Sequence, residues 1–104
     1  YLKPFRTLVE DYDANGLMSS YNRIGAVWAG GSKALLTDVL RGEWGFHGAV
    51  ITDYCDHHAF MNGDQALRAG TSLWMSGVTG GQFAQETSSD SYLNALLNVA
   101  KMFF

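Results

Sequence analysis

The residue best placed to do chemistry is Asp53, which ends a run of small and β-branched residues. Residues 48–52 (GAVIT) contain strong strand formers and no charged side chain. Such a run is typical of a strand that a parallel sheet buries on both faces. Catalytic side chains in α/β folds collect at the carboxyl ends of strands, where a carboxylate could attack carbon or transfer a proton. An Asp after a strand is also a common turn residue or helix cap, so position alone leaves both roles open.

The segment after this strand contains side chains that bind metals in other proteins. Cys55, Asp56, His57 and His58 stand almost side by side. Their spacing matches no zinc pattern, because adjacent ligands on one short loop rarely complete a tetrahedral site. Solvated loop residues are the simpler interpretation, and we expect neither a metal nor another cofactor.

A glycine-rich loop is predicted over residues 22–32, with Trp28 between its glycines. Glycine-rich loops can bind phosphate, but neither GxGxxG nor the Walker pattern is present. We interpret the loop as arching over a site, with Trp28 either stacking on a ligand or anchoring the loop by packing.

The elements that must position Asp53 alternate between helix and strand. An apolar stripe predicts a helix that begins near Pro4, and Ser32 can cap a second helix over residues 33–41 that Gly42 ends. A short helix over residues 65–69, capped by Asp64 and ended by Gly70, precedes a loop over 77–89 and a final helix. The stripe of the first helix is Phe5, Leu8, Val9 and Tyr12, and the strands are expected over residues 17–21, 48–53 and 71–75.

Repeated strand–helix units imply parallel strands. We therefore predict an α/β fold of three parallel βα units, in one segment over residues 1–104. Three strands leave two exposed sheet edges, and a complete eight-stranded α/β barrel needs about 250 residues. The chain is thus expected to be a partial TIM-barrel-like segment of a larger (β/α)8 domain, with an open three-layer α/β domain as the alternative.

The composition excludes several classes of protein. The 104 residues are 47% hydrophobic and 16% charged, with a formal net charge of −3 and one cysteine. Nucleic-acid binding has no electrostatic basis here, and an internal disulfide cannot form. No apolar run is long enough to span a bilayer, and no signal peptide is recognised, so we expect no membrane partner. The compartment, cytoplasmic or secreted, stays open.

Five ordered pieces of the sequence resemble glycoside hydrolase family 3, in its β-glucosidase-like branch. They are residues 2–5 (LKPF), 18–23 (MSSYNR), 35–46 (LLTDVLRGEWGF), 50–54 (VITDY) and 69–75 (AGTSLWM). The resemblance implies the C-terminal part of that family's N-terminal barrel domain. Thr52-Asp53-Tyr54 stands where the family has a Ser-Asp-Trp motif, which implies that Asp53 is the catalytic nucleophile.

The resemblance also implies residues that contact the substrate. Tyr21 matches a position close to the nucleophile, and its hydroxyl is expected to hydrogen-bond the carboxylate of Asp53. Tyr54 replaces the tryptophan that helps to wall the leaving-group side. Met18 and Met75 match strand-end positions that face the pocket.

A retaining glycosidase needs a second carboxyl group as its acid and base. Glu10 is expected on the outer layer and Glu43 at the opposite end of the barrel, so Glu86, in a polar loop, is the only glutamate that could reach the site. The family normally takes this acid from a later domain, so we expect the chain alone to be inactive.

The resemblance predicts a retaining, exo-acting β-glycosidase, β-glucosidase-like, whose partners are a β-linked glucoside or related oligosaccharide and the remaining domains of the parent enzyme. Two other interpretations stay open. One is a structural α/β module that pairs into homo-oligomers through its sheet edges. The other is an unrelated nucleotide- or metal-binding α/β protein.

Overall fold

The computed structural model describes residues 1–54 and 60–76, together with Leu93, Leu96, Leu97 and Ala100. These last four are helical, as expected for part of the predicted final helix, and their side chains are exposed. The predicted loop over residues 77–89 and the remainder of that helix lie outside the described residues. So do Cys55, Asp56, His57, His58 and Glu86.

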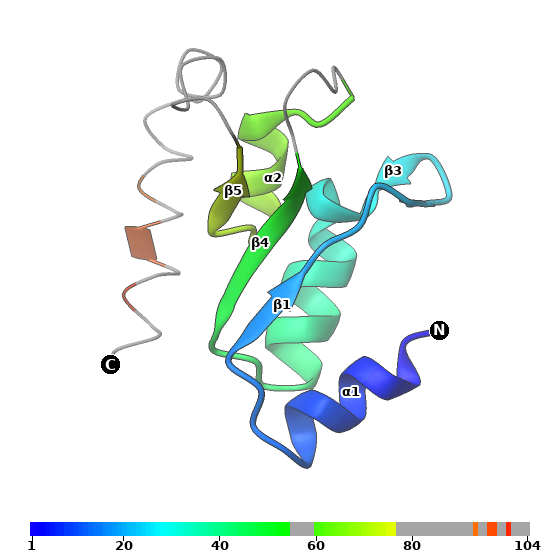
Figure 1. Cartoon of the computed structure of the whole chain (residues 1–104), viewed down its shortest axis with the longest axis vertical. Helices are drawn as coiled ribbons and strands as arrows, with labels where there is room; N and C mark the ends of the chain where they lie inside the picture. Colours follow the sequence, from blue (N-terminus) through cyan, green and yellow to red (C-terminus); the bar gives the residue numbers. More distant parts are fainter. Residues whose placement is uncertain (55–59, 77–92, 94–95, 98–99, 101–104) are drawn as a thin grey trace.

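A parallel three-stranded sheet forms the centre of the fold (Figure 1). Its strands are β1 (Gly16–Met18), β4 (Ala49–Tyr54) and β5 (Leu73–Met75), in the order β1-β4-β5. Met18 pairs with Ile51, and Ile51 pairs with Leu73. The predicted mixed α/β fold with three parallel strands is therefore confirmed, although β1 and β5 are shorter than expected.

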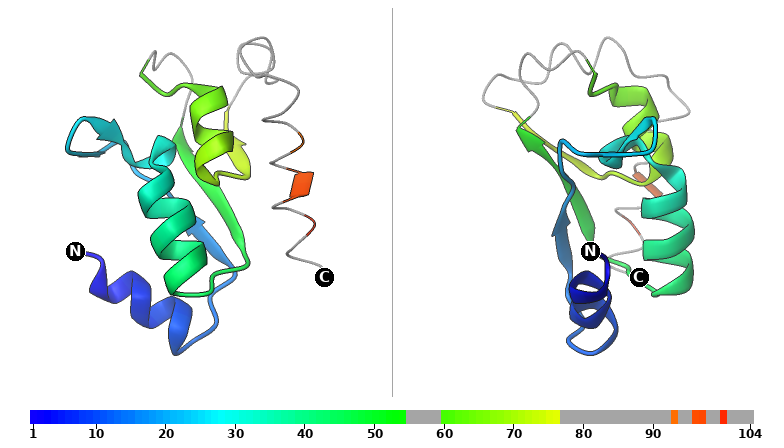
Figure 2. Two further views of the ribbon diagram at one scale, coloured as in Figure 1. Left: turned by 180° about the vertical axis from the view of Figure 1, so that it is seen from behind. Right: turned by 90° about the vertical axis from the view of Figure 1, so that its right-hand side faces the viewer.

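The two connecting helices lie on the same face of this sheet (Figure 2). Helix η2 (Ala34–Glu43) follows β1 and precedes β4, and Ser32 caps it as predicted by accepting a hydrogen bond from the amide of Leu35. The helix does not end at Gly42, because the amide of Trp44 still donates to the carbonyl oxygen of Val39, five residues back. The chain leaves the helix at Gly45, three residues after Gly42, where φ is 70°.

Helix α2 (Gly63–Ala69) connects β4 to β5. Its cap is Asn62, whose side chain accepts from the amide of Gln65 at 2.8 Å, and not the predicted Asp64. Asp64 lies inside the first turn and forms an ion pair with Arg68 at 2.8 Å. Gly70 ends the helix as predicted, with a left-handed φ of 114°.

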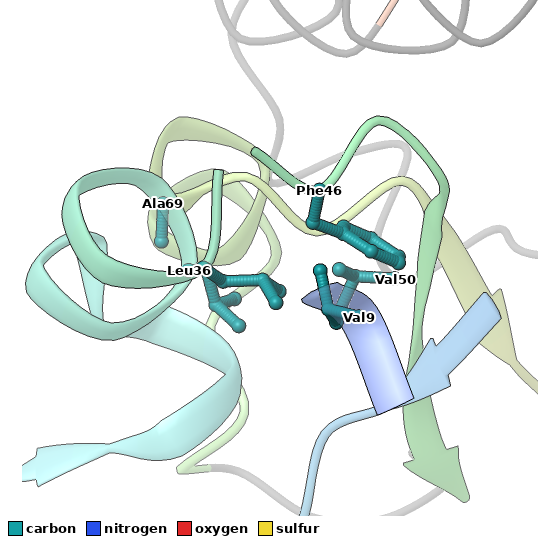
Figure 3. Close-up of a cluster of buried hydrophobic side chains, with 6 residues drawn as sticks. Val9, Leu36, Phe46, Val50 and Ala69 are labelled. Atoms are coloured by element: carbon teal, nitrogen blue, oxygen red, sulfur yellow. The ribbon is translucent and has the colours of Figure 1, made fainter. Parts of the chain in front are cut away.

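Apolar side chains between the sheet and the helices form the core shown in Figure 3. Its buried members are Val9, Leu36, Leu40, Phe46, Val50 and Ala69. Val50 and Thr52 are buried towards the helices, whereas Ile51 and Asp53 on the other face are half-buried. The expectation of a strand buried on both faces is therefore wrong for the described part of the chain, because its helices η2 and α2 cover one face only.

Helix α1 (Lys3–Glu10) begins with Pro4 in its first turn, as predicted. Its apolar stripe does not pack as expected: only Val9 is buried, while Phe5 and Leu8 are exposed. The helix lies beside β1 at the margin of the fold (Figure 1). Val9 is its one residue in the buried cluster.

The predicted glycine-rich loop contains a small hairpin. Strands β2 (Arg23–Ile24) and β3 (Val27–Trp28) pair antiparallel around Gly25, whose φ is 62°. A single helical turn, η1 (Ala29–Gly31), follows. Strands of two residues carry no usable periodicity, which is why the sequence predicted only a loop.

Candidate active site

Four of the five predicted site residues lie at the carboxyl ends of the sheet strands. Met18 ends β1, Asp53 and Tyr54 end β4, and Met75 ends β5. Because all three strands are parallel, their carboxyl ends lie together at one end of the sheet (Figure 1). Tyr54 is the direct pairing partner of Met75. The fifth residue, Tyr21, lies in the segment after β1. It reaches the same end of the sheet, because its hydroxyl contacts Tyr54.

Asp53 is half-buried and follows the fully buried Thr52. One carboxylate oxygen, Oδ1, accepts a hydrogen bond from the backbone amide of Tyr54 at 2.8 Å. Asp53 does not cap α2, since Asn62 holds that position. Within the described ranges, Asp53 takes part in none of the ion pairs, so its charge is not neutralised by a Lys or Arg there. A partly exposed carboxylate with one fixed oxygen is suited to nucleophilic attack by the other.

Tyr21 contacts Tyr54, the neighbour of Asp53, instead of the Asp53 carboxylate. Its hydroxyl donates to the carbonyl oxygen of Tyr54 at 2.7 Å. A phenol has one proton to donate, so this bond replaces the direct donation to Asp53 that the sequence predicted. Tyr21 therefore fixes the backbone beside the carboxylate.

An aromatic cluster stands next to Tyr21. The ring of Phe60 makes edge-to-face contacts with the rings of Tyr21 and Trp28, at centroid distances of 6.4 and 6.3 Å. The guanidinium of Arg23 lies 5.9 Å from the centre of the Phe60 ring. Trp28 is buried and donates through Nε1 to the carbonyl oxygen of Ser20 at 2.8 Å. Of the two roles considered for Trp28, packing is the one that the structure supports.

Two residues that were not among the predicted site residues lie at this end of the sheet. Phe60 joins the segment after β4 to the hairpin, and its position depends on a chain path that no local pattern reveals. Thr52 is fully buried, and its hydroxyl accepts from the backbone amide of Met75 at 3.0 Å. The sequence placed Thr52 in the Thr-Asp-Tyr motif at the end of an apolar strand, but nothing in that pattern revealed its hydrogen bond to β5.

Neither glutamate in the described part of the chain offers a second carboxyl group to Asp53. Glu10, on α1, is ion-paired with Arg6 at 2.8 Å. Glu43 ends helix η2, before β4 begins, and so lies at the end of the sheet opposite Asp53. No group of three or more His, Cys, Asp or Glu in the part of the chain that the structure describes could hold a metal ion. Among the same residues, no helix is both long and apolar enough to cross a membrane.

One protein family covers almost the whole length of this sequence. Residues 1–101 match the family described as "Glycosyl hydrolase family 3 N terminal domain". The chain belongs to glycoside hydrolase family 3. The resemblance seen in the ordered sequence pieces is thereby confirmed.

Relatives of this family-3 chain carry the names of two kinds of glycosidase. It is 38% identical over 79 residues to the "Probable beta-glucosidase J" of Neosartorya fischeri, a match covering 76% of the chain and 9% of that protein. It is 40% identical over 75 residues to the exo-alpha-(1->6)-L-arabinopyranosidase of Bifidobacterium breve, covering 72% of the chain and 10% of that enzyme.

The fold of the family-3 chain also matches solved structures. A beta-glucosidase from Paenibacillus barengoltzii superimposes with a TM-score of 0.76 at 27% identity, covering 99% of the chain and 13% of that structure. The chain thus spans about a tenth of the length of the curated relatives that it matches.

Proposed function

We propose that Asp53 is the nucleophile of a retaining, exo-acting β-glycosidase of the β-glucosidase type. The observation that carries this proposal is the position of Asp53 within a family-3 match: it lies at the carboxyl end of the central strand, half-buried and without a cationic partner among the described residues. Tyr21, Tyr54, Met18 and Met75 are proposed to contact the substrate at the same strand ends.

The proposed reaction has two displacements. A carboxylate oxygen of Asp53 forms a bond to the anomeric carbon while the bond from that carbon to the leaving oxygen breaks and an acid protonates the leaving group. Water then attacks the same carbon, the bond to Asp53 breaks, and the acid's conjugate base takes the water's proton. Both displacements invert the carbon, so the product retains its configuration. The step needs no cofactor.

The acid is proposed to come from outside this chain. Among the described residues, Glu10 is engaged by Arg6 and Glu43 lies at the opposite end of the sheet. Retaining enzymes hold their two carboxyl groups about 5–5.5 Å apart, which neither residue can satisfy with Asp53. The 104-residue chain alone is therefore expected to be inactive.

We also propose that the three βα units are part of a larger (β/α)8 barrel. Strand β1 is an edge strand, and an apolar groove of about 610 Å³ runs beside it between α1 and η2. The hydroxyl of Ser19, in this groove, is buried and has no hydrogen-bond partner among the described residues. An unpaired edge with an apolar groove is suited to a further strand of the parent protein, which would supply that partner.

The substrate class follows from the relatives and is proposed as a β-linked glucoside or a related oligosaccharide. The beta-glucosidase and the arabinopyranosidase that match this chain differ in their sugar. A match to this segment alone therefore does not distinguish between the two sugars.

Replacing the nucleophile in the parent enzyme tests this proposal. Asp53→Ala is expected to lower turnover of an aryl β-glucoside by roughly 10³-fold or more, because no covalent intermediate can form. Added azide should restore part of the rate and give the α-configured glycosyl azide, since it replaces the missing carboxylate in a single inversion. The matched control is Asp11→Ala, which removes an exposed carboxylate at the end of α1. Full turnover by Asp53→Ala would refute the assignment.

A further inference from the structure

Strand β4 contains a β-bulge at the nucleophile. Ile51 pairs with Leu73, whereas Tyr54 pairs with Met75. Three steps along β4 therefore match two steps along β5, and the extra residue falls within Thr52–Asp53. In a regular ladder Asp53 itself would be the partner of Met75, so the bulge frees Asp53 from strand pairing. Bulges of this kind redirect side chains next to active sites.

The hydroxyl of Thr52 closes this bulge. Where the ladder is interrupted, the backbone amide of Met75 donates to Oγ1 of Thr52 at 3.0 Å. The side-chain oxygen thus takes the place of the backbone carbonyl that a regular ladder would offer. Because Thr52 is 0% exposed, water cannot replace its hydroxyl as the acceptor for the amide of Met75.

We infer that Thr52 is a positioning residue for the proposed glycosidase reaction: its hydroxyl holds the bulge that presents the Asp53 carboxylate to the substrate. This inference rests on the proposed function of Asp53. Without the hydroxyl, the amide of Met75 must find another acceptor, and the nearest alternative is the regular register. A one-residue shift turns side chains to the opposite face of a sheet, which would re-aim Asp53 relative to Met75.

A nearly isosteric substitution in the parent enzyme isolates the hydroxyl. Thr52→Val keeps the branched shape and removes the acceptor. Because the nucleophile is misdirected while the sugar pocket stays in place, kcat is expected to fall about tenfold or more with KM changed by less than about twofold. Thr52→Ser retains the acceptor and should keep kcat within about threefold of the wild type.

The control must be an equally buried threonine away from the bulge. Thr71 is also 0% exposed, and its hydroxyl donates to the carbonyl oxygen of Gly30 at 2.9 Å. It precedes β5 near the level of Val50, since the amide of Ser72 donates to the carbonyl oxygen of Val50. Thr71→Val should lower thermal stability about as much as Thr52→Val and leave kcat unchanged. Equal losses of kcat in the two variants would overturn the inference.

Two further comparisons complete the test. If Thr52→Val does not fold, Thr52→Ser is compared with Thr52→Cys, because a thiol of similar size is a weak acceptor; equal kcat values would overturn the inference. Asp53→Ala is measured in parallel. Turnover by Asp53→Ala refutes the proposed function, whereas an inactive Asp53→Ala beside a fully active Thr52→Val refutes only the role of Thr52.

Discussion

The hydroxyl of Tyr21 donates a 2.7 Å hydrogen bond to the carbonyl oxygen of Tyr54, which follows it by 33 residues. Just before this contact, the amide of Ser19 donates to the carbonyl oxygen of Ile51 at 2.9 Å. The segment after β1 thus holds β4 on both sides of Asp53. On the other side, the hydroxyl of Thr52 accepts from the amide of Met75 in β5. The backbone around the proposed nucleophile is therefore held both by the segment after β1 and by β5.

Removing the Tyr21 hydroxyl should weaken catalysis without unfolding the protein. Tyr21→Phe in the parent enzyme is expected to lower kcat/KM about fivefold, which corresponds to the roughly 1 kcal/mol of an average intramolecular hydrogen bond. The edge-to-face contact with Phe60 would be kept. Steady-state kinetics on an aryl β-glucoside measure the effect. Tyr12→Phe is the control, because Tyr12 is 75% exposed; no difference between the two variants would contradict the role of Tyr21.

The start of the β1–β4 pair depends on a glycine. A Cβ at Gly48 would overlap the backbone carbonyl group of Asn15, which accepts from the amide of Ala49 at 3.0 Å. Gly48→Ala is therefore expected to destabilise the parent enzyme by about 2 kcal/mol or more, since backbone atoms must move. Gly16, at the start of β1, has no atom within 4 Å of such a Cβ and should tolerate Ala. Midpoints of thermal inactivation compare the two, and equal midpoints would contradict the expectation.

Much of the fold could be predicted from local sequence, and the predictions that were wrong have physical causes. The apolar run before Asp53 and the left-handed Gly70 were predicted correctly, since both are local signals. The cap of α2 was not, because Asn62 and Asp64 are both suitable side chains. The choice depends on the extended backbone of Asn62, with a φ of −73° and a ψ of 120°.

The candidate site also has features that the sequence predicted and features that depend on contacts between distant segments. Strand-end position alone left Asp53 open as a cap or a turn residue, and only the resemblance of the ordered sequence pieces to family 3 implied that it is the nucleophile, a role that stays a prediction. The bulge was not predictable, because it is defined only by how β4 pairs with β5. The acceptor of the Tyr21 hydroxyl likewise depends on contacts between distant segments.

Arg41 joins three segments at the end of the sheet away from Asp53. Its guanidinium donates to the carbonyl oxygens of Gly48 and Gly70 at 3.1 and 2.9 Å, and it lies 5.5 Å from the centre of the Phe46 ring. Burial lowers the pKa of Arg41, because desolvation disfavours the charged form. These contacts tie η2 to the starts of β4 and β5, and through them support the strands that carry the site.

Replacing Arg41 should therefore cost stability at every ordinary pH. Arg41→Met leaves two carbonyl oxygens without their donor but also removes the cost of burying a charge, so we expect a net loss of about 2 kcal/mol. The lowered pKa makes the folded state release this proton before the unfolded chain does, and stability would rise with pH only in the strongly alkaline window between the two pKa values.

Between pH 5 and 9 the guanidinium is charged in both states, so the difference in thermal midpoint between wild type and Arg41→Met should stay constant over that range. Arg68→Met is the control, because Arg68 forms an exposed ion pair with Asp64 that is worth less than about 1 kcal/mol. Thermal unfolding of the parent enzyme at several pH values measures both variants. A difference that disappears towards pH 9 would show that a group other than Arg41 titrates at this junction.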